Sequence, residues 1–153
     1  VGGEINLFLP TNKNLGYGIH FKNEVIFTEV SGGQSDAFRI PATFLNMKAY
    51  WEGSWFNHSI PVQIGIDVHH KSAYYANAYD PVTQQFYLQN DEKVFEGYSY
   101  PANLFWNMRI EKVFLFIKST HISQPNDGGY FVTPKYPGQQ RVLDFGFKWL
   151  FFD

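Results

Sequence analysis

Few side chains in this chain of 153 residues could take part in catalysis or metal binding. There are five histidines, and His69 and His70 are adjacent. Neighbouring residues of a β-strand point to opposite faces, so these two imidazole rings are not expected to share one metal ion. Acid–base catalysis needs converging carboxylates, for which the candidates are Glu52, Asp67, Glu111 and Asp144. Because polar and apolar residues alternate around them, we expect these carboxylates to line a polar surface rather than to catalyse a reaction.

Other functional classes lack the residues that they require. The chain has no cysteine, which excludes a disulfide framework, a thiolate nucleophile and a cysteine metal site. Residues 31–34 are rich in glycine but include no lysine, so they do not match a phosphate-binding loop. The formal net charge of −2 gives no general attraction for nucleic acid. We therefore expect neither an enzyme nor a nucleic-acid-binding protein, and we expect no metal and no cofactor.

Four segments alternate between polar and apolar residues with period two, which is typical of β-strands that have one apolar face. They are residues 15–21, 43–56, 60–68 and 102–110. A soluble sheet covers its apolar face with protein, whereas a transmembrane barrel turns that face to lipid and its polar face to the lumen. We expect the second arrangement, with the lumen lined by Gln63, Asp67, Asn103, Asn107, Arg109, Asp144 and Lys148.

The C-terminal segment, residues 142–153, is the strongest indication of a membrane protein. Its apolar residues fall on one side of a period-two ladder, whereas Asp144, Gly146 and Lys148 fall on the other side. A soluble sheet seldom ends on a strand so rich in aromatic residues with no later element to cover them. We therefore expect lipid to contact Leu143, Phe145, Phe147, Trp149 and Phe151.

The expected connections alternate between short and long, as they do in outer-membrane barrels. The sequence predicts tight turns at residues 22–23, 57–59 and 111–112, and longer polar loops at residues 31–36, 76–96 and 122–140. With residues 5–9 as the first strand there are about eight strands, of which the first three look short, and both chain ends lie on one side of the membrane. The predicted fold is all-β: an antiparallel up-and-down transmembrane β-barrel, with residues 1–153 as a single domain or the C-terminal part of one.

Two stretches in about the last hundred residues carry a family likeness. One comprises Tyr74-Tyr75-Ala76, residues 78–81 and residues 86–90. The other comprises residues 129–131, residues 133–137, Arg141 and the closing run Phe145-Gly146-Phe147-Lys148-Trp149-Leu150-Phe151-Phe152-Asp153. Together they resemble the outer-membrane porins of Bacteroidetes-type bacteria. Ser123 departs from the family pattern, which tends to have asparagine at that loop entrance.

The resemblance implies an outer-membrane β-barrel with a role in transport. Family members are longer than this chain and carry an export signal, so we expect the chain to be the C-terminal part of a wider barrel whose lumen lets small hydrophilic solutes diffuse through. The resemblance also implies that Phe147, Trp149 and Phe151 belong to a signal that the barrel-insertion machinery reads. The expected partners are outer-membrane lipid, that machinery and other outer-membrane subunits.

Three alternatives remain open at this stage. A closed barrel of about eight strands has an interior filled by side chains and would not conduct. A barrel could instead act as a scaffold in an outer-membrane complex, with its function in the loops. A soluble β-sandwich that binds polysaccharide would also show alternation, and Trp51, Trp55 or Tyr98 could then form a platform for sugar rings.

Overall fold

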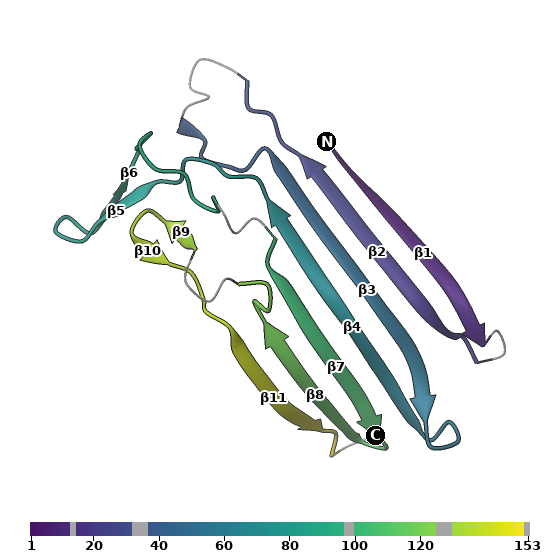
Figure 1. Ribbon diagram of the computed structural model, residues 1–153. Helices are drawn as coiled ribbons and strands as arrows, with labels where there is room; N and C mark the ends of the chain where they lie inside the picture. Colours follow the sequence, from purple (N-terminus) through teal and green to yellow (C-terminus); the bar gives the residue numbers. More distant parts are fainter. Residues whose placement is uncertain (13–14, 32–36, 97–99, 125–129, 152–153) are drawn as a thin grey trace.

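The computed structural model of the chain is built around one large antiparallel sheet (Figure 1). The structure describes residues 1–12, 15–31, 37–96, 100–124 and 130–151. Within these residues the sheet contains the strands β1 Gly2–Asn12, β2 Tyr17–Phe27, β3 Thr43–Trp55, β4 Ile60–Lys71, β7 Ala102–Ile110, β8 Val113–Thr120 and β11 Val142–Trp149. They follow one another in chain order across the sheet, and each neighbouring pair is antiparallel. The predicted all-β, antiparallel up-and-down fold is confirmed.

The connections at one end of the sheet are short and those at the other end are long, as predicted. We call these the turn end and the loop end (Figure 1). At the turn end, β3 is joined to β4 and β7 to β8 by tight turns in which Asn57 and Glu111 have φ values of 53° and 50°. At the loop end, the connection after β4 contains a hairpin of β5 Ala78–Asp80 and β6 Gln85–Tyr87, and the connection after β8 contains a hairpin of β9 Phe131–Thr133 and β10 Tyr136–Pro137.

The predicted tight turn at residues 22–23 is wrong, because β2 runs straight through it. Lys22 and Asn23 keep the alternation of a strand and pair with residues of both β1 and β3. The chain reverses instead between Asn12 and Tyr17, where Gly16 has a φ of 69° that favours glycine. Two expected short strands are therefore one strand of 11 residues, and the sheet has seven described strands rather than about eight.

The prediction that both chain ends lie on one side of the membrane is also wrong for the described strands, because β1 begins and β11 ends at opposite ends of the sheet. The ammonium group of Val1 donates a hydrogen bond to the Phe27 carbonyl oxygen at the loop end, at 2.8 Å. Trp149 pairs with Val113 at the turn end. Because the described strands are odd in number, the first and last strands start and finish at opposite ends of the sheet. The last strand stops at Trp149, and Phe151 follows it with its ring 4.9 Å from the Trp149 ring, whereas residues 152 and 153 lie outside the described part.

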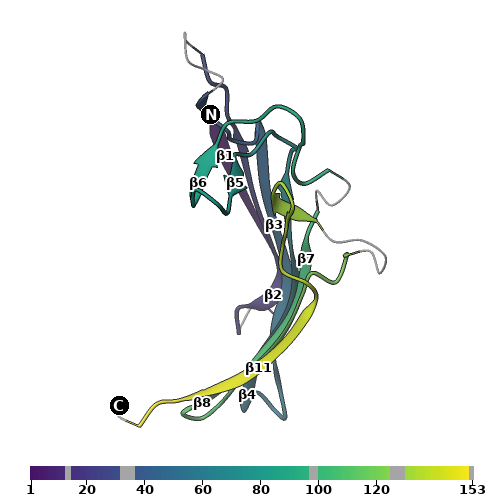
Figure 2. The same ribbon diagram turned by 90° about the vertical axis from the view of Figure 1, so that its left-hand side faces the viewer.

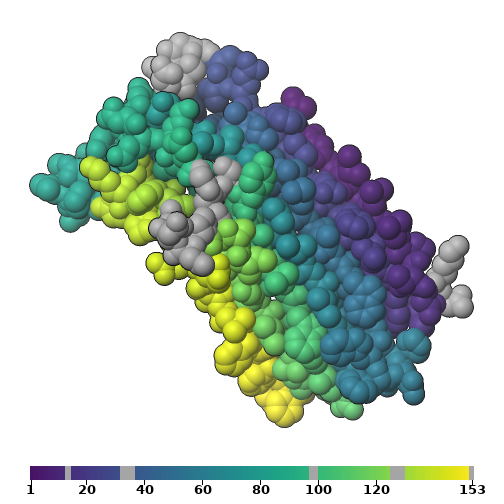
Figure 3. Space-filling model, viewed as in Figure 1, coloured from purple at the N-terminus to yellow at the C-terminus, as the bar shows by residue number. Residues whose placement is uncertain are grey.

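The sheet is a single curved layer (Figure 2). Its side chains form a continuous surface from the purple β1 to the yellow β11 (Figure 3). The other described sheets are the two small hairpins, so no second sheet of comparable size covers either face as a β-sandwich would require. Within the described residues β1 pairs with β2 alone and β11 with β8 alone, which leaves the sheet open at both edges. No described helix is long and apolar enough to cross a membrane.

Candidate functional site

The register of the strands separates charged from apolar side chains. No Asp, Glu, Lys or Arg side chain of the seven described strands falls on the face that carries Ile64, Trp106 and Phe145, which we call the apolar face. The eleven charged residues of these strands lie on the opposite, polar face: Glu4, Lys22, Glu24, Lys48, Glu52, Asp67, Lys71, Arg109, Lys118, Asp144 and Lys148. The sheet therefore has one face suited to water and one suited to an apolar surrounding.

All the residues predicted to line a lumen share the polar face. Gln63 lies opposite Asn107, and Asp67 opposite Asn103, between β4 and β7. Arg109 and Lys148 both lie opposite Phe114 of β8, and Asp144 lies opposite Lys118. Residues from three separate segments of the sequence, Gln63, Asp67, Asn103, Asn107, Arg109, Asp144 and Lys148, are thus brought onto one surface.

The residues predicted to contact lipid lie on the apolar face of β11 and just beyond it. Leu143, Phe145, Phe147 and Trp149 are exposed by 68, 81, 70 and 54 %, and Phe151, which follows the strand, by 72 %. No described part of the chain seals the rings of Phe145, Phe147 and Trp149 inside a protein core. The ring centres of Trp55 and Trp106 lie 5.7 Å apart on the same face, and Trp55 and Trp149 lie at the turn end.

A hollow of about 590 Å³ near the turn end of the polar face brings together four of the predicted lumen residues. Gln63 and Asn107 contribute amide groups from β4 and β7, whereas Arg109 and Lys148 contribute positive charge from β7 and β11. Four further residues of the polar face line it, namely Glu52, Pro61, Phe114 and Phe116. The hollow can therefore offer both hydrogen-bond donors and apolar contact to a solute.

The guanidinium group of Arg109 is held in place within this hollow. Its Nε donates a hydrogen bond to the Glu111 carbonyl oxygen at 2.8 Å, which ties the side chain to the tight turn after β7. Its Cζ lies 5.1 Å from the centre of the Phe114 ring, a cation–π arrangement. Fixing the guanidinium in this way lowers the entropy that is lost when it binds a ligand.

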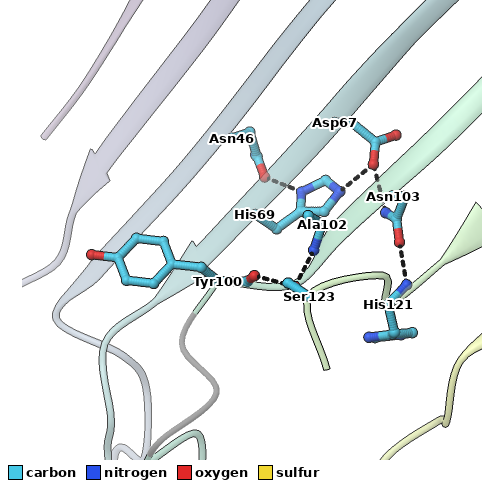
Figure 4. Close-up of polar contacts among 8 residues, drawn as sticks. All are labelled: Asn46, Asp67, His69, Tyr100, Ala102, Asn103, His121 and Ser123. Atoms are coloured by element: carbon cyan, nitrogen blue, oxygen red, sulfur yellow. Dashed lines mark hydrogen bonds and ion pairs between the residues drawn. The ribbon is translucent and has the colours of Figure 1, made fainter. Parts of the chain in front are cut away.

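A second polar cluster lies closer to the loop end and joins β3, β4 and β7 (Figure 4). Asn103 Nδ2 donates to Asp67 Oδ1 at 2.5 Å, and His69 Nε2 lies 3.7 Å from the same oxygen. His69 Nδ1 is 2.7 Å from Asn46 Oδ1, while Asn46 Nδ2 donates to Glu24 Oε2 at 2.9 Å. Because the Asn46 amide nitrogen faces Glu24, its oxygen faces His69, and Nδ1 of His69 must carry the proton.

The same cluster fixes the chain where the loop after β8 begins (Figure 4). The backbone N–H of His121 donates to Asn103 Oδ1 at 3.0 Å. The Ser123 hydroxyl donates to the Tyr100 carbonyl oxygen at 2.8 Å and accepts from the Ala102 backbone N–H at 3.1 Å. Ser123 therefore links this loop entrance to the start of β7.

Replacing Asn103 with leucine is expected to destabilise the fold by about 1–3 kcal/mol, because the change leaves the partly buried His121 N–H and an Asp67 oxygen without their partner. Asn103 is only 7 % exposed, so water cannot easily replace the amide. Asn107→Leu is the matched control, because Asn107 has no side-chain hydrogen bond within the described residues. Denaturant unfolding of both variants in detergent measures the difference, and equal losses would show that the cluster contributes nothing specific.

Aromatic rings cross the middle of the polar face, a feature that sequence reasoning missed. Phe8 and Tyr50 lie on either side of His20, with each ring centre 4.6 Å from that of His20. Phe105 continues the row at 6.4 Å from Tyr50. The position between them belongs to Gly65, which pairs with both Tyr50 and Phe105. We call Phe8, His20, Tyr50 and Phe105 the aromatic row.

Glycine is required where these rings lie across a neighbouring strand. A Cβ atom on Gly65 would meet the Tyr50 Cβ, approach the Phe105 Cζ to 2.8 Å and the Ala49 carbonyl oxygen to 2.5 Å. The same relation recurs at Gly18, where the Cβ would lie 2.6 Å from the Phe8 ring, and at Gly146, where it would lie 2.7 Å from the Phe116 ring. Rings that pack over glycine in this way compensate for the missing side chain.

The long loops have a packed core of their own. Val94 is 1 % exposed and packs with Ala76, Phe95 and Tyr130. The Lys71 ammonium group lies 5.2 Å from the centre of the Phe95 ring. This cation–π contact joins the loop core to the polar face of β4. The Tyr74 ring stacks on the Phe95 ring, and the Tyr79 ring contacts the rings of Phe86 and Tyr136. Tyr98, a candidate for sugar stacking, lies outside the described residues.

Burial shifts the pKa of two side chains at or near the loop core. Burial lowers the pKa of the His121 imidazole below its usual value, and the nearby positive charges of His69 and Lys118 lower it further. His121 is therefore neutral near pH 7, in a stacked position 5.4 Å from the Tyr130 ring. Burial also raises the pKa of the Tyr74 hydroxyl, which stays protonated. Within the described residues no group of three or more His, Asp and Glu side chains is placed to hold a metal ion.

The fold and the two-faced sheet together define a porin-like β protein of the outer-membrane type. Residues 2–153 match the model of a family described as "Putative porin", so the chain belongs to this porin family. The match confirms the family resemblance and extends it from about the last hundred residues to nearly the whole chain. No curated protein and no solved structure was found to match.

Proposed function

We propose that the seven-stranded sheet is part of a transmembrane β-barrel in a bacterial outer membrane and that small hydrophilic solutes diffuse passively through its lumen. The observation that carries this proposal is the placement of all eleven charged side chains of the described strands on one face. Lipid tails tolerate no such charges, whereas a water-filled lumen favours them. Passage of this kind needs no catalytic residue and no cofactor.

Two further features support a membrane position for the apolar face. Many of its large side chains are exposed, including Ile64 in the middle of the sheet and Phe145 at the edge. Two of its tryptophans, Trp55 and Trp149, lie at the turn end, where a belt of amphipathic rings would meet the membrane–water interface. In this arrangement Phe147, Trp149 and Phe151 are available to the machinery that inserts barrels.

The barrel that we propose is wider than the seven described strands. Both edges of the sheet lack a neighbouring strand within the described residues, so β1 and β11 each offer a row of backbone donors and acceptors. In a membrane these groups must be paired, which requires additional strands and closure. A barrel of about eight strands is filled by side chains, whereas a wider one leaves room for water.

Cysteine labelling of the full-length protein in planar bilayers tests the proposal. Asn107 and Leu104 both lie in β7, but Asn107 is on the polar face and Leu104, 48 % exposed, is on the apolar face. Asn107→Cys is expected to react with a charged, water-soluble methanethiosulfonate and to lose conductance in discrete steps, because the adduct narrows the lumen. Leu104→Cys, which does not line the hollow, is the matched control and is expected to conduct unchanged. The native sequence of this segment has no cysteine that could react instead.

The scaffold alternative receives support from the loop core, which buries side chains of two long loops, whereas loops usually run over the surface. Val94 and its neighbours would hold both hairpins in a fixed arrangement that a partner subunit could recognise. If the wild-type protein inserts into bilayers but stays silent, the passive-diffusion proposal is wrong and the scaffold becomes the better account.

A further inference from the structure

Charged groups on the polar face differ in how they are partnered. Three carboxylates accept a hydrogen bond from an asparagine amide: Glu4 from Asn6, Glu24 from Asn46 and Asp67 from Asn103. Glu52 lies 3.4 Å from His20 Nε2, and Asp144 on the edge strand has no such contact within the described residues. By contrast, none of the cations on this face has a carboxylate within 4.0 Å in the described part: Lys22, Lys48, Lys71, Arg109, Lys118 and Lys148.

Two of these unpaired cations line the turn-end hollow. Arg109 uses Nε for the Glu111 carbonyl oxygen and rests on Phe114, which leaves both terminal nitrogens of its guanidinium without a described partner. Lys148 reaches the same hollow from β11, opposite Phe114. A guanidinium presents two parallel N–H donors that match a carboxylate or a phosphate group, and an ammonium adds a second positive charge.

The rest of the lining favours the same kind of ligand. Gln63 and Asn107 offer amide groups that can bond to hydroxyl or carboxylate oxygens, and Phe116 offers an apolar wall. Glu52 is the one carboxylate among the described lining residues, and it lies next to His20. With two cations against one anion, the hollow attracts negative charge, and about 590 Å³ is enough for a small organic molecule.

We propose that this hollow binds the anionic group of small organic solutes, a carboxylate or a phosphate, and so makes the passage selective for anions. The inference rests on the proposed function, because it names the class of solute that the lumen favours. Arg109 is the main determinant of this selectivity, because its guanidinium is fixed in position and presents two parallel N–H donors. Lys148 contributes a second positive charge.

Citrate block of the chloride current through the full-length protein in planar bilayers tests this site. For wild type we expect an anion-selective reversal potential in a KCl gradient and block by citrate. In the Arg109→Gln, Lys148→Gln double variant we expect the half-blocking concentration to rise at least about tenfold, as expected when a charge-assisted hydrogen bond is lost. Arg109→Lys keeps the charge but not the fork, so we expect an intermediate rise.

Lys22→Gln, Lys48→Gln is the matched control, because it removes two unpaired cations of the same face that do not line the hollow. We expect it to change the half-blocking concentration by less than about threefold, because long-range charge is screened by salt. If the half-blocking concentration changed equally in the two double variants, the proposed site would be wrong, and the block would depend only on the total charge of the lumen. Circular dichroism and migration of unboiled samples on gels establish that each variant is folded.

The outcome separates the inference from the proposed function. A wild-type protein that conducts but shows no citrate block and no anion preference would refute the inference alone. A wild-type protein that does not conduct would refute passive diffusion, and titration calorimetry with citrate in detergent would then decide about the site. Binding that is lost in Arg109→Gln, Lys148→Gln would support the site without a pore, whereas no binding to wild type would overturn it.

Discussion

Replacing Ile64 with arginine is expected to lower the stability of the membrane-inserted protein by about 2–4 kcal/mol, as for an arginine near the middle of the lipid-facing surface of a barrel. Ile64 lies inside β4 on the apolar face, opposite Trp51 in β3 and Trp106 in β7. The guanidinium would have to lie in hydrocarbon or displace these rings to reach water. Denaturant titration of the protein folded into lipid vesicles measures the loss.

Gln63→Arg is the matched control for this prediction. Gln63 is the preceding residue of the same strand, but its side chain lies on the polar face beside Glu52 and Asn107. An arginine there would enter the proposed lumen and is expected to change the stability by less than about 0.5 kcal/mol. If Ile64→Arg were tolerated as well as Gln63→Arg, or yielded a protein that is soluble without detergent, the apolar face would not be in lipid.

Replacing Gly65 with alanine is expected to destabilise the sheet by about 1–3 kcal/mol, because the added methyl group overpacks the site. The new Cβ would meet the Tyr50 Cβ and would lie 2.5 Å from the Ala49 carbonyl oxygen, and neither is a flexible side-chain end. The strands must therefore separate locally or shift. Unfolding in denaturant measures the cost, and a Phe105→Leu second change is expected to recover part of it by removing the third contact.

Gly3→Ala serves as the control for Gly65→Ala, since a Cβ atom on Gly3 would meet nothing within 4 Å. Both glycines lie within strands, so the two substitutions change the flexibility of the unfolded chain alike. The expected result for Gly3→Ala is a change of less than about 0.5 kcal/mol. Similar losses at the two positions would mean that the ring of Phe105 and the backbone of β3 do not enclose Gly65 as described.

The separation of the two faces could be predicted from the sequence because it depends on local periodicity. Period-two alternation places Gln63 and Asp67 on one side of β4 whatever strand lies beside it. The same holds for Phe145 and Phe147 in β11. The tight turns at residues 57–59 and 111–112 were found for a similar reason, since polar residues interrupt the alternation there.

Features that depend on contacts between distant segments could not be predicted. The pattern around Lys22 and Asn23 resembles a turn, and only pairing with both β1 and β3 shows that β2 continues. The aromatic row needs the register of five strands, β1 to β4 and β7, which the alternation of each strand does not supply. Likewise, the loop core assembles Val94 with Tyr130, which are separated in sequence by β7 and β8.

The rings that pack over glycine have a consequence for how neighbouring strands find their alignment during folding. If one strand slipped by one residue along its neighbour, its apolar side chains would turn toward the polar face. A slip by two residues would keep each side chain on its own face, so the hydrophobic effect would not oppose it. In that slipped alignment Phe105 would face a side chain of β4 instead of Gly65, and Phe116 would face one of β11 instead of Gly146. The glycines under these rings therefore favour the native alignment over slipped alignments that the apolar pattern alone would allow equally well.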